Sequence, residues 1–342
     1  VKDINPGTWL STPTNLTNVN GTLFFATTTD ATYWRELWKS DGTEVWTVMV
    51  KDINPGTGHA ITSTTASFTN VNGTLFFAAT NGTSWVELWK SDGTESGTEL
   101  VKDIYTWTTA SIVYTAWTVA PYFTAVWSTL YFTARSGSST NYELWKSDGT
   151  SSGTVLVKDI ISWVTWSYPA NLTNVNGTLF FSVNNGTSWI ELWKSDGTDS
   201  GTILVKDVYT WPVWSNPSNL TNINGILFFT ATNGDFWQEL WKSDGTENGT
   251  QMIKNINPIG YSWLDLLKAN LTKVWDILYF LANNWAHWDE LWQSDGTDSG
   301  TFMIDDIISW VTSSTPANLT NVNGTLFFTA TNDTIWLELW KK

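Results

Sequence analysis

Short apolar runs separated by turn residues repeat along the whole chain of 342 residues. In the first period the runs are Asn15–Val19, Thr22–Thr27, Glu36–Lys39 and Val48–Ile53. Runs of this length, bounded by Gly, Asn, Asp and Ser, are typical of β-strands and are too short for helices. The pattern therefore predicts an all-β protein with four strands in each period.

The connections inside a period carry strong turn signals. Asn-Gly joins the first two runs at Asn20-Gly21, Asn72-Gly73, Asn176-Gly177, Asn224-Gly225 and Asn323-Gly324. Asn-Gly between apolar runs predicts a two-residue hairpin, because a type I′ turn needs positive φ at both central residues. The second run reads Thr-Leu-Phe-Phe in four periods. Bulky residues at successive positions indicate that both faces of the sheet are covered.

The sequence Glu-Leu-Trp-Lys-Ser-Asp-Gly-Thr, first at Glu36–Thr43, sets the period. Its seven copies begin at Glu36, Glu87, Glu143, Glu191, Glu239, Glu290 and Glu338, which lie 51, 56, 48, 48, 51 and 48 residues apart. The sixth copy has Gln293 in place of Lys, and the last copy ends at Lys342. Such a period indicates one repeat domain whose units bury their core against each other.

A four-stranded antiparallel unit of this length fits the blade of a β-propeller. We expect a single domain over residues 1–342, with seven blades at about 9–53, 58–104, 110–160, 166–208, 214–256, 263–307 and 313–342 plus 1–4. Val1–Ile4 reads as a fourth strand without a third, and the last period has a third strand without a fourth. We therefore expect Val1–Ile4 to pair with the C-terminal blade and close the ring.

The repeated octapeptide resembles the ELWxSDGT repeat of bacterial secreted and surface proteins, and the resemblance covers essentially the whole chain through all seven copies. It implies a propeller-like extracellular module without catalytic residues, often part of a larger protein. Leu37–Thr43 is also similar, more loosely, to the Asp-box hairpin of sialidase-like propellers. Sialidase chemistry relies on an arginine triad, and the chain has only Arg35 and Arg135.

Composition narrows the class of partner. The chain has 17 basic and 32 acidic residues and a net charge of −15, which argues against nucleic-acid or anionic-membrane partners. It has no cysteine, so disulfides and thiolate metal sites are excluded. No apolar run approaches the roughly 20 residues that span a bilayer. Because the sequence begins within a repeat, we interpret it as a monomeric domain of a larger protein.

The repeated residues are expected to be structural. The motif tryptophans should be core residues: Trp38, Trp89, Trp145, Trp193, Trp241, Trp292 and Trp340. The motif aspartates should form turns, since Asp before Gly bonds its own backbone: Asp41, Asp92, Asp148, Asp196, Asp244 and Asp295. Calcium is a minor alternative at Asp196 and Asp199, and no other cofactor is expected. We interpret the Lys-Asp pairs, such as Lys51-Asp52, as solvated edge charge. His59 and His287 should be surface loop residues.

Nineteen of the 26 tryptophans lie outside the motif, often where sibling repeats have glycine. Trp46 takes the place of Gly97 and its equivalents, and Trp127-Ser128 and Trp275-Asp276 replace Asn-Gly. Six more stand two residues before the motif Glu: Trp34, Trp85, Trp189, Trp237, Trp288 and Trp336. We hypothesise that the nineteen are glycine codons (UGA) read under the wrong genetic code. The alternative is a set of exposed aromatic platforms for sugars. Either way, many should be exposed in loops.

Near-identical repeats supply equivalent residues around a ring, which suits binding better than catalysis, because an enzyme needs one unique constellation. We expect a non-enzymatic binding, adhesion or spacer module, secreted or at a bacterial cell surface, with a protein or glycan ligand. The alternative is a carbohydrate-active or carbohydrate-binding propeller. Its site would lie in the divergent loops of units three and six, at Ile112–Tyr122 with Arg135, and at Leu264–Leu267 with His287.

Overall fold

A computed structural model of the chain describes residues 1–5, 10–28, 34–56, 58–61, 67–106, 110–112, 123–135, 137, 142–161, 167–187, 190–208, 215–232, 234, 238–256, 271–284, 289–305, 307, 313–332 and 336–342. The chain divides into two compact units. The first comprises Val1–Leu179 and Asp196–Thr202, and the second comprises Phe180–Ser195 and Ile203–Lys342.

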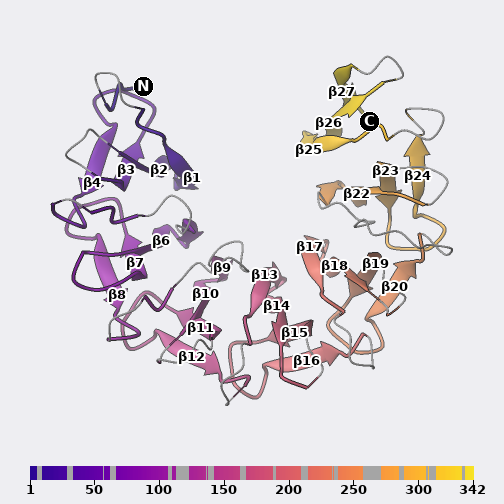
Figure 1. Ribbon diagram of the computed structural model, residues 1–342, viewed down its shortest axis with the longest axis horizontal. Helices are drawn as coiled ribbons and strands as arrows, with labels where there is room; N and C mark the ends of the chain where they lie inside the picture. The colour runs from indigo at the N-terminus through magenta and orange to yellow at the C-terminus, as the bar shows by residue number, and fades with distance from the viewer. Residues whose placement is uncertain are drawn as a thin grey trace. The chain divides into compact units, whose positions relative to one another are not determined.

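The described residues form 27 strands in seven antiparallel sheets, each in sequence order (Figure 1). The first three sheets are β1 (Thr14–Val19), β2 (Thr22–Thr27), β3 (Glu36–Ser40), β4 (Val48–Lys51); β5 (Thr69–Val71), β6 (Thr74–Ala79), β7 (Glu87–Ser91), β8 (Glu99–Lys102); and β9 (Phe123–Val126), β10 (Thr129–Ala134), β11 (Glu143–Ser147), β12 (Val155–Lys158).

The remaining sheets repeat this order. They are β13 (Ala170–Val175), β14 (Thr178–Asn184), β15 (Ile190–Ser195), β16 (Ile203–Lys206); β17 (Ser218–Ile223), β18 (Ile226–Thr232), β19 (Gln238–Ser243), β20 (Gln251–Lys254); β21 (Thr272–Val274), β22 (Ile277–Ala282), β23 (Glu290–Ser294), β24 (Phe302–Asp305); and β25 (Ala317–Val322), β26 (Thr325–Thr331), β27 (Leu337–Lys341). The predicted all-β class is confirmed, and four strands per period are confirmed for the first six periods.

The hairpin between the first two strands of a sheet has the predicted backbone. Asn20 has φ 51° and Gly21 has φ 85°, and the other four Asn-Gly pairs have positive φ at both residues as well. Asparagine and glycine tolerate this left-handed region better than other residues. Trp127 and Trp275, which replace Asn in two periods, hold the same conformation with φ 55° and 54°.

The register of the third and fourth strands contains a bulge in six sheets. In the first sheet Leu37 pairs with Lys51 and Trp38 pairs with Met49, so Val50 is the extra residue. The same shift occurs in the other five four-stranded sheets. A bulge adds local twist to a strand pair, and its recurrence makes it a feature of the repeat.

The core lies between neighbouring sheets. In the first unit Phe24 and Leu37 of the first sheet pack in one cluster with Phe77 and Trp89 of the second. In the second unit Phe228 and Leu240 belong to a cluster with Phe280 and Trp292 of the next sheet. This packing explains why β2, β6, β18 and their equivalents are apolar on both faces, as the successive Leu-Phe-Phe residues predict.

The predicted pairing of Val1–Ile4 with the C-terminal blade is not found. The last sheet has three strands, β25–β26–β27, and Val1–Ile4 adopts no strand. Instead, the Nζ of Lys2 donates to the carbonyl oxygen of Thr47 (3.1 Å) and lies 5.9 Å from the centroid of the Trp38 ring. Seven sheets are present, but the predicted seventh four-stranded blade is incomplete.

Across the residues that the structure describes, no helix is long and apolar enough to cross a membrane.

Candidate functional site

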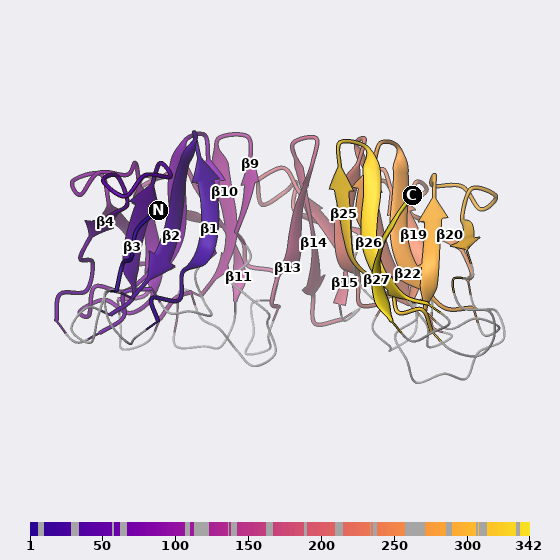
Figure 2. The same cartoon turned by 90° about the horizontal axis from the view of Figure 1, so that it is seen from above.

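One end of each sheet carries the ordered turns, and we call it the hairpin face. In an antiparallel meander the turn between strands one and two and the turn between strands three and four lie at the same end. Figure 2 shows the β1–β2 and β9–β10 turns at this end of the first unit. The opposite end, where one sheet connects to the next, is called the linker face.

Each motif aspartate shapes its turn on the hairpin face. The Oδ1 of Asp92 accepts hydrogen bonds from the backbone N–H (2.8 Å) and the hydroxyl (2.7 Å) of Thr94. These two bonds hold the pKa of the Asp92 carboxyl below its usual range. The same pair of bonds forms at the other five aspartates, Asp41, Asp148, Asp196, Asp244 and Asp295. The turn-forming role predicted for the motif Asp is confirmed.

Both aspartates of the calcium alternative have partners within the chain. The Oδ1 of Asp196 is engaged by Thr198, and the Oδ1 of Asp199 lies 3.4 Å from the Nζ of Lys158. Nowhere in the described part of the chain do three or more His, Asp or Glu side chains form a group that could hold a metal ion.

Lysines of one sheet bind the turn of the next. The Nζ of Lys39 donates to the carbonyl oxygen of Gly93 (2.7 Å), and the Nζ of Lys90 donates to that of Gly149 (2.8 Å). A ring packs on the same glycine: a Cβ on Gly93 would lie 3.0 Å from the Cζ of Phe24. Equivalent lysine bonds occur at Lys146, Lys194 and Lys242. The Gly of the motif therefore makes room for the neighbouring sheet as well as for its own turn.

The lysine of the Lys-Asp pair also reaches the next sheet. The Nζ of Lys102 donates to the carbonyl oxygen of Thr154 (2.8 Å), and Lys206 does the same to Thr250 (2.8 Å). Lys51 contacts Thr98 in this way (2.7 Å). The interpretation of this lysine as solvated edge charge was wrong, because the ammonium group crosses to the neighbouring turn. The contact between Lys2 and Thr47 repeats the same geometry.

A groove of about 410 Å³ opens on the hairpin face between the second and third sheets of the first unit. Its lining includes Lys90, Glu99 and the aspartates Asp92 and Asp148, with Asn72 and Ser128 from the inner turns. Lys90 and Glu99 form an ion pair of 3.1 Å. The groove is thus polar, carries charges of both signs, and has an excess of carboxylates.

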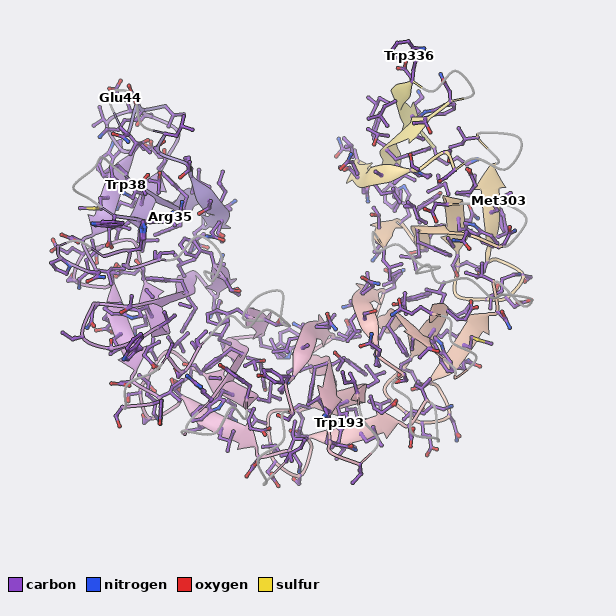
Figure 3. All side chains as sticks on the ribbon, viewed as in Figure 1. Arg35, Trp38, Glu44, Trp193, Met303 and Trp336 are labelled. Atoms are coloured by element: carbon purple, nitrogen blue, oxygen red, sulfur yellow. The ribbon has the colours of Figure 1, made fainter. Side chains whose placement is uncertain are left out.

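The motif tryptophans lie where the sequence places them. Trp38, Trp89, Trp145, Trp193, Trp241 and Trp292 are buried, and in Figure 3 Trp38 and Trp193 lie within their sheets. Trp292 lies 6.5 Å from the ring of Phe280, centroid to centroid. Trp340, in the three-stranded sheet, is only half-buried. A core role is confirmed for the six in four-stranded sheets.

Six of the nineteen other tryptophans fall within the described residues, and all six are exposed in turns or loops: Trp34, Trp46, Trp85, Trp127, Trp275 and Trp336. The prediction of loop exposure is confirmed for them. A positive φ occurs at Trp127 and Trp275 only. Trp34, Trp85 and Trp336, which precede the motif, have no positive φ, so their backbone conformation does not require glycine.

The divergent loops of units three and six fall largely outside the described residues. This holds for 113–122, for 264–267 and for His287, while Ile112 is buried in the core. The Nε of Arg135 donates to the carbonyl oxygen of Ala110 (2.9 Å), and its guanidinium lies 5.7 Å from the ring centroid of Tyr142.

His59 is exposed, as predicted, and has a structural role on the linker face. Its Nδ1 accepts the backbone N–H of Arg35 (2.9 Å), and its ring meets Trp34 edge-on, with 4.6 Å between centroids. Burial and the nearby Arg35 lower the pKa of His59. The Nη2 of Arg35 donates to the hydroxyl of Thr12 (3.1 Å).

Sequence reasoning missed the first residue of the motif. The glutamate of Glu-Leu-Trp is buried in all six four-stranded sheets, although carboxylates are rarely buried without a role. The sequence did carry a signal for this buried residue, because an acidic side chain stands directly before the apolar pair Leu-Trp in every repeat.

Comparison with known proteins supports the fold alone. No protein-family model and no curated protein sequence matches the chain. Among solved structures, a prolyl endopeptidase matches with a TM-score of 0.51 at 13% identity, over 96% of this chain and 49% of its own. A puromycin hydrolase variant matches with a TM-score of 0.47 at 13% identity, over 100% of this chain and 55% of its own. The chain thus spans about half the length of these proteins. The seven sheets and the match to the prolyl endopeptidase show an all-β, propeller-like repeat fold.

Proposed function

We propose that the chain is a non-enzymatic binding module of a bacterial secreted or surface protein, and that the hairpin face is its binding surface. The observation that carries the proposal is the repetition of one Asp turn on that face, with the same two hydrogen bonds at six positions. Equivalent groups in an array favour repeated contacts with a partner over a single catalytic event.

The chemistry of the face indicates the class of ligand. The turn aspartates have lowered pKa values because of their Thr hydrogen bonds, so they stay ionised at neutral pH. The groove between the second and third sheets adds Lys90, Glu99 and Asn72. Carboxylates beside amide and ammonium donors fit a hydroxyl-rich glycan or a basic segment of a protein, and the net charge of −15 opposes a polyanion.

A glycan array and a pull-down from the producing bacterium's environment would test the proposal. Asp92→Asn combined with Asp148→Asn removes two charges from the groove and keeps the Oδ1 acceptors of the turns. We expect at least a tenfold loss of affinity, which is about 1.4 kcal/mol. The matched control is Asp103→Asn with Asp159→Asn, two exposed aspartates at the other end of their sheets. Equal losses in both pairs, or no ligand at all, would contradict the proposed surface.

We also propose that the last sheet is completed by Val1–Ile4. The segment has the same sequence, Val-Lys-Asp-Ile, as Val157–Ile160. In the first sheet Leu37 pairs with Lys51, so the equivalent pair in a completed last sheet would be Leu339 with Lys2. The chain has no cysteine, so Lys2→Cys with Leu339→Cys gives a clean cross-linking test. A disulfide within one chain supports closure, and Lys2→Cys with Val322→Cys is the off-register control. A disulfide between two chains, or none, would reject it.

A further inference from the structure

A buried glutamate begins the third strand of every four-stranded sheet. The six are Glu36, Glu87, Glu143, Glu191, Glu239 and Glu290, and their exposed fractions range from 0% to 6%. Taking a carboxylate out of water is costly unless hydrogen bonds or opposite charges replace the lost hydration.

The first partner of each glutamate belongs to the same sheet. The Oε2 of Glu87 accepts the backbone N–H of Ile104 (3.0 Å), just after the fourth strand ends. The equivalent bond forms at the other five glutamates, with distances of 2.8 to 3.4 Å, to Ile53, Ile160, Val208, Ile256 and Ile307. Each carboxyl group therefore holds the chain where it leaves the sheet.

The second partner is a serine of the linker into the next sheet. The Oε2 of Glu87 accepts the hydroxyl of Ser111, and its Oε1 accepts the backbone N–H of the same serine (3.2 Å). Ser215 and Ser314 donate their hydroxyls to Glu191 and Glu290, both at 2.6 Å. Through these bonds one carboxyl group joins the end of one sheet to the beginning of the next.

The first sheet lacks this second partner. Ala60 takes the serine's place after Glu36, and the Oε1 of Glu36 has no hydrogen-bond partner among the described residues. Glu143 and Glu191 also have an Oε1 without a partner there. Hydrogen bonds therefore replace the lost hydration of these carboxylates only in part.

The neighbouring charges oppose ionisation. The titratable group that faces each glutamate is the aspartate of the Lys-Asp pair: Asp52, Asp103, Asp159 and Asp207 for Glu36, Glu87, Glu143 and Glu191. The lysines of the pair turn away to carbonyl groups of the next sheet. Burial raises the pKa of Glu36 to about 8, and of Glu87, Glu143 and Glu191 to about 7.

We propose that the buried glutamates of the motif are pH-dependent latches at the ends of the sheets: because the carboxyl group is buried, the fold is most stable while the group is protonated in mildly acidic surroundings and loses stability as the group ionises. The latch bonds lie at the linker face, so the proposal is independent of the binding surface proposed above. It predicts a protein whose stability rises on acidification.

The direction follows from proton linkage. Within the window between the unfolded pKa of about 4.3 and the folded values near neutrality, the folded chain binds more protons than the unfolded chain, so stability falls as pH rises. Below this window Glu36, Glu87, Glu143 and Glu191 are protonated in both states. Above it they are ionised in both, and the loss is complete.

Thermal unfolding from about pH 5 to about pH 8 tests the proposal with one variant and one control. Glu87→Gln keeps the shape and removes the ionisation, so its Tm relative to wild type should rise by roughly 2–4 °C across this range. Glu95→Gln removes the same charge from an exposed turn, and its difference from wild type should stay constant with pH. The proposal is overturned if the Tm of both variants changes with pH in parallel with the Tm of wild type.

The serines offer a second, graded test. Ser111→Ala removes a hydrogen-bond donor from Glu87, as in Glu36, so Tm should fall more steeply as pH rises. Ala60→Ser adds a donor near Glu36, so Tm should fall less steeply. Should the glutamine variant fail to fold, the wild-type protein still decides the question. Calorimetric refolding at about pH 6.5, in buffers of different ionisation enthalpy, counts the protons taken up. An uptake of several protons per chain supports the latches, and an uptake of no protons refutes them.

Discussion

The sixth sheet contains tryptophan in two settings that follow opposite rules. Trp292, in β23, is 5% exposed and packs against Phe280. Trp275, in the turn between β21 and β22, is 71% exposed and has φ 54°. Its Nε1 donates to the carbonyl oxygen of Gly324 (3.2 Å) in the next turn.

The difference shows which tryptophans the fold requires. Trp292 occupies a place that tryptophan holds in every repeat, inside a core that it helps to fill. Trp275 occupies a place that Asn holds in five repeats, in a conformation that a bulky residue adopts at a cost. Trp292 should therefore be indispensable for stability, whereas the replacement of Trp275 should increase stability.

The largest effect is expected from truncating the core residue. Trp292→Ala should lower the free energy of unfolding by about 3–5 kcal/mol, because it removes a buried ring and leaves a cavity. Urea unfolding followed by circular dichroism would measure the loss. A cost below about 1 kcal/mol would show that the site collapses around the smaller residue or that the ring is not packed.

A smaller effect is expected at the same position of the last sheet. Trp340 is half-buried and the flanking Leu339 on β27 is 71% exposed in this sheet of three strands. Figure 3 shows Trp336 where the chain leads into β27, at the edge of this sheet. Trp340→Ala should therefore cost less than half as much as Trp292→Ala. Equal costs would indicate that a fourth strand, such as Val1–Ile4, covers the residue in solution.

Replacing the turn tryptophans should stabilise the protein. Trp127→Asn should raise the free energy of unfolding by about 1 kcal/mol, since Asn holds the same φ in five sibling turns. Trp275→Asn should gain less, because it loses the bond to Gly324. Trp127→Ala is the control, since alanine does not relieve the left-handed strain. If alanine stabilises as much as asparagine, the benefit comes from removing the ring and not from the backbone.

The smallest effect is expected at Trp46. It is exposed in the turn between β3 and β4, and its φ is not positive. Its backbone N–H donates to the hydroxyl of Thr43 (3.3 Å), as the backbone N–H of Gly97 does to Thr94. Trp46→Gly should change the stability by no more than about 0.5 kcal/mol. A large change in denaturant midpoint in either direction would mean that this turn is not equivalent to its siblings.

The glycine-codon hypothesis is not tested by the structure, although Trp127 and Trp275 hold a positive φ, which glycine and asparagine adopt more readily than tryptophan. It gains nothing from φ at Trp34, Trp46, Trp85 and Trp336. The coding DNA decides it: UGA at most of the nineteen positions is the expected result, and UGG would reject the hypothesis.

Local patterns alone determined the strands and turns of this protein. The apolar runs, Asn20-Gly21 and Asp41-Gly42 specify short strands and tight turns through interactions a few residues apart, so the bounds of β1 to β4 follow closely from the sequence. The repeat then predicted which face of each strand is buried, because identical units can only bury their cores against one another.

Contacts between sheets were decided by the tertiary structure. The sequence of Glu338–Trp340 is the same as that of Glu290–Trp292, yet the first is largely exposed and the second is buried, because burial depends on the strands and sheets that pack around the motif. The bond of Lys90 to Gly149 joins residues 59 positions apart, and the bond of Ser111 to Glu87 joins residues 24 positions apart. Such partners are chosen by how neighbouring sheets pack, and only the folded chain brings them together.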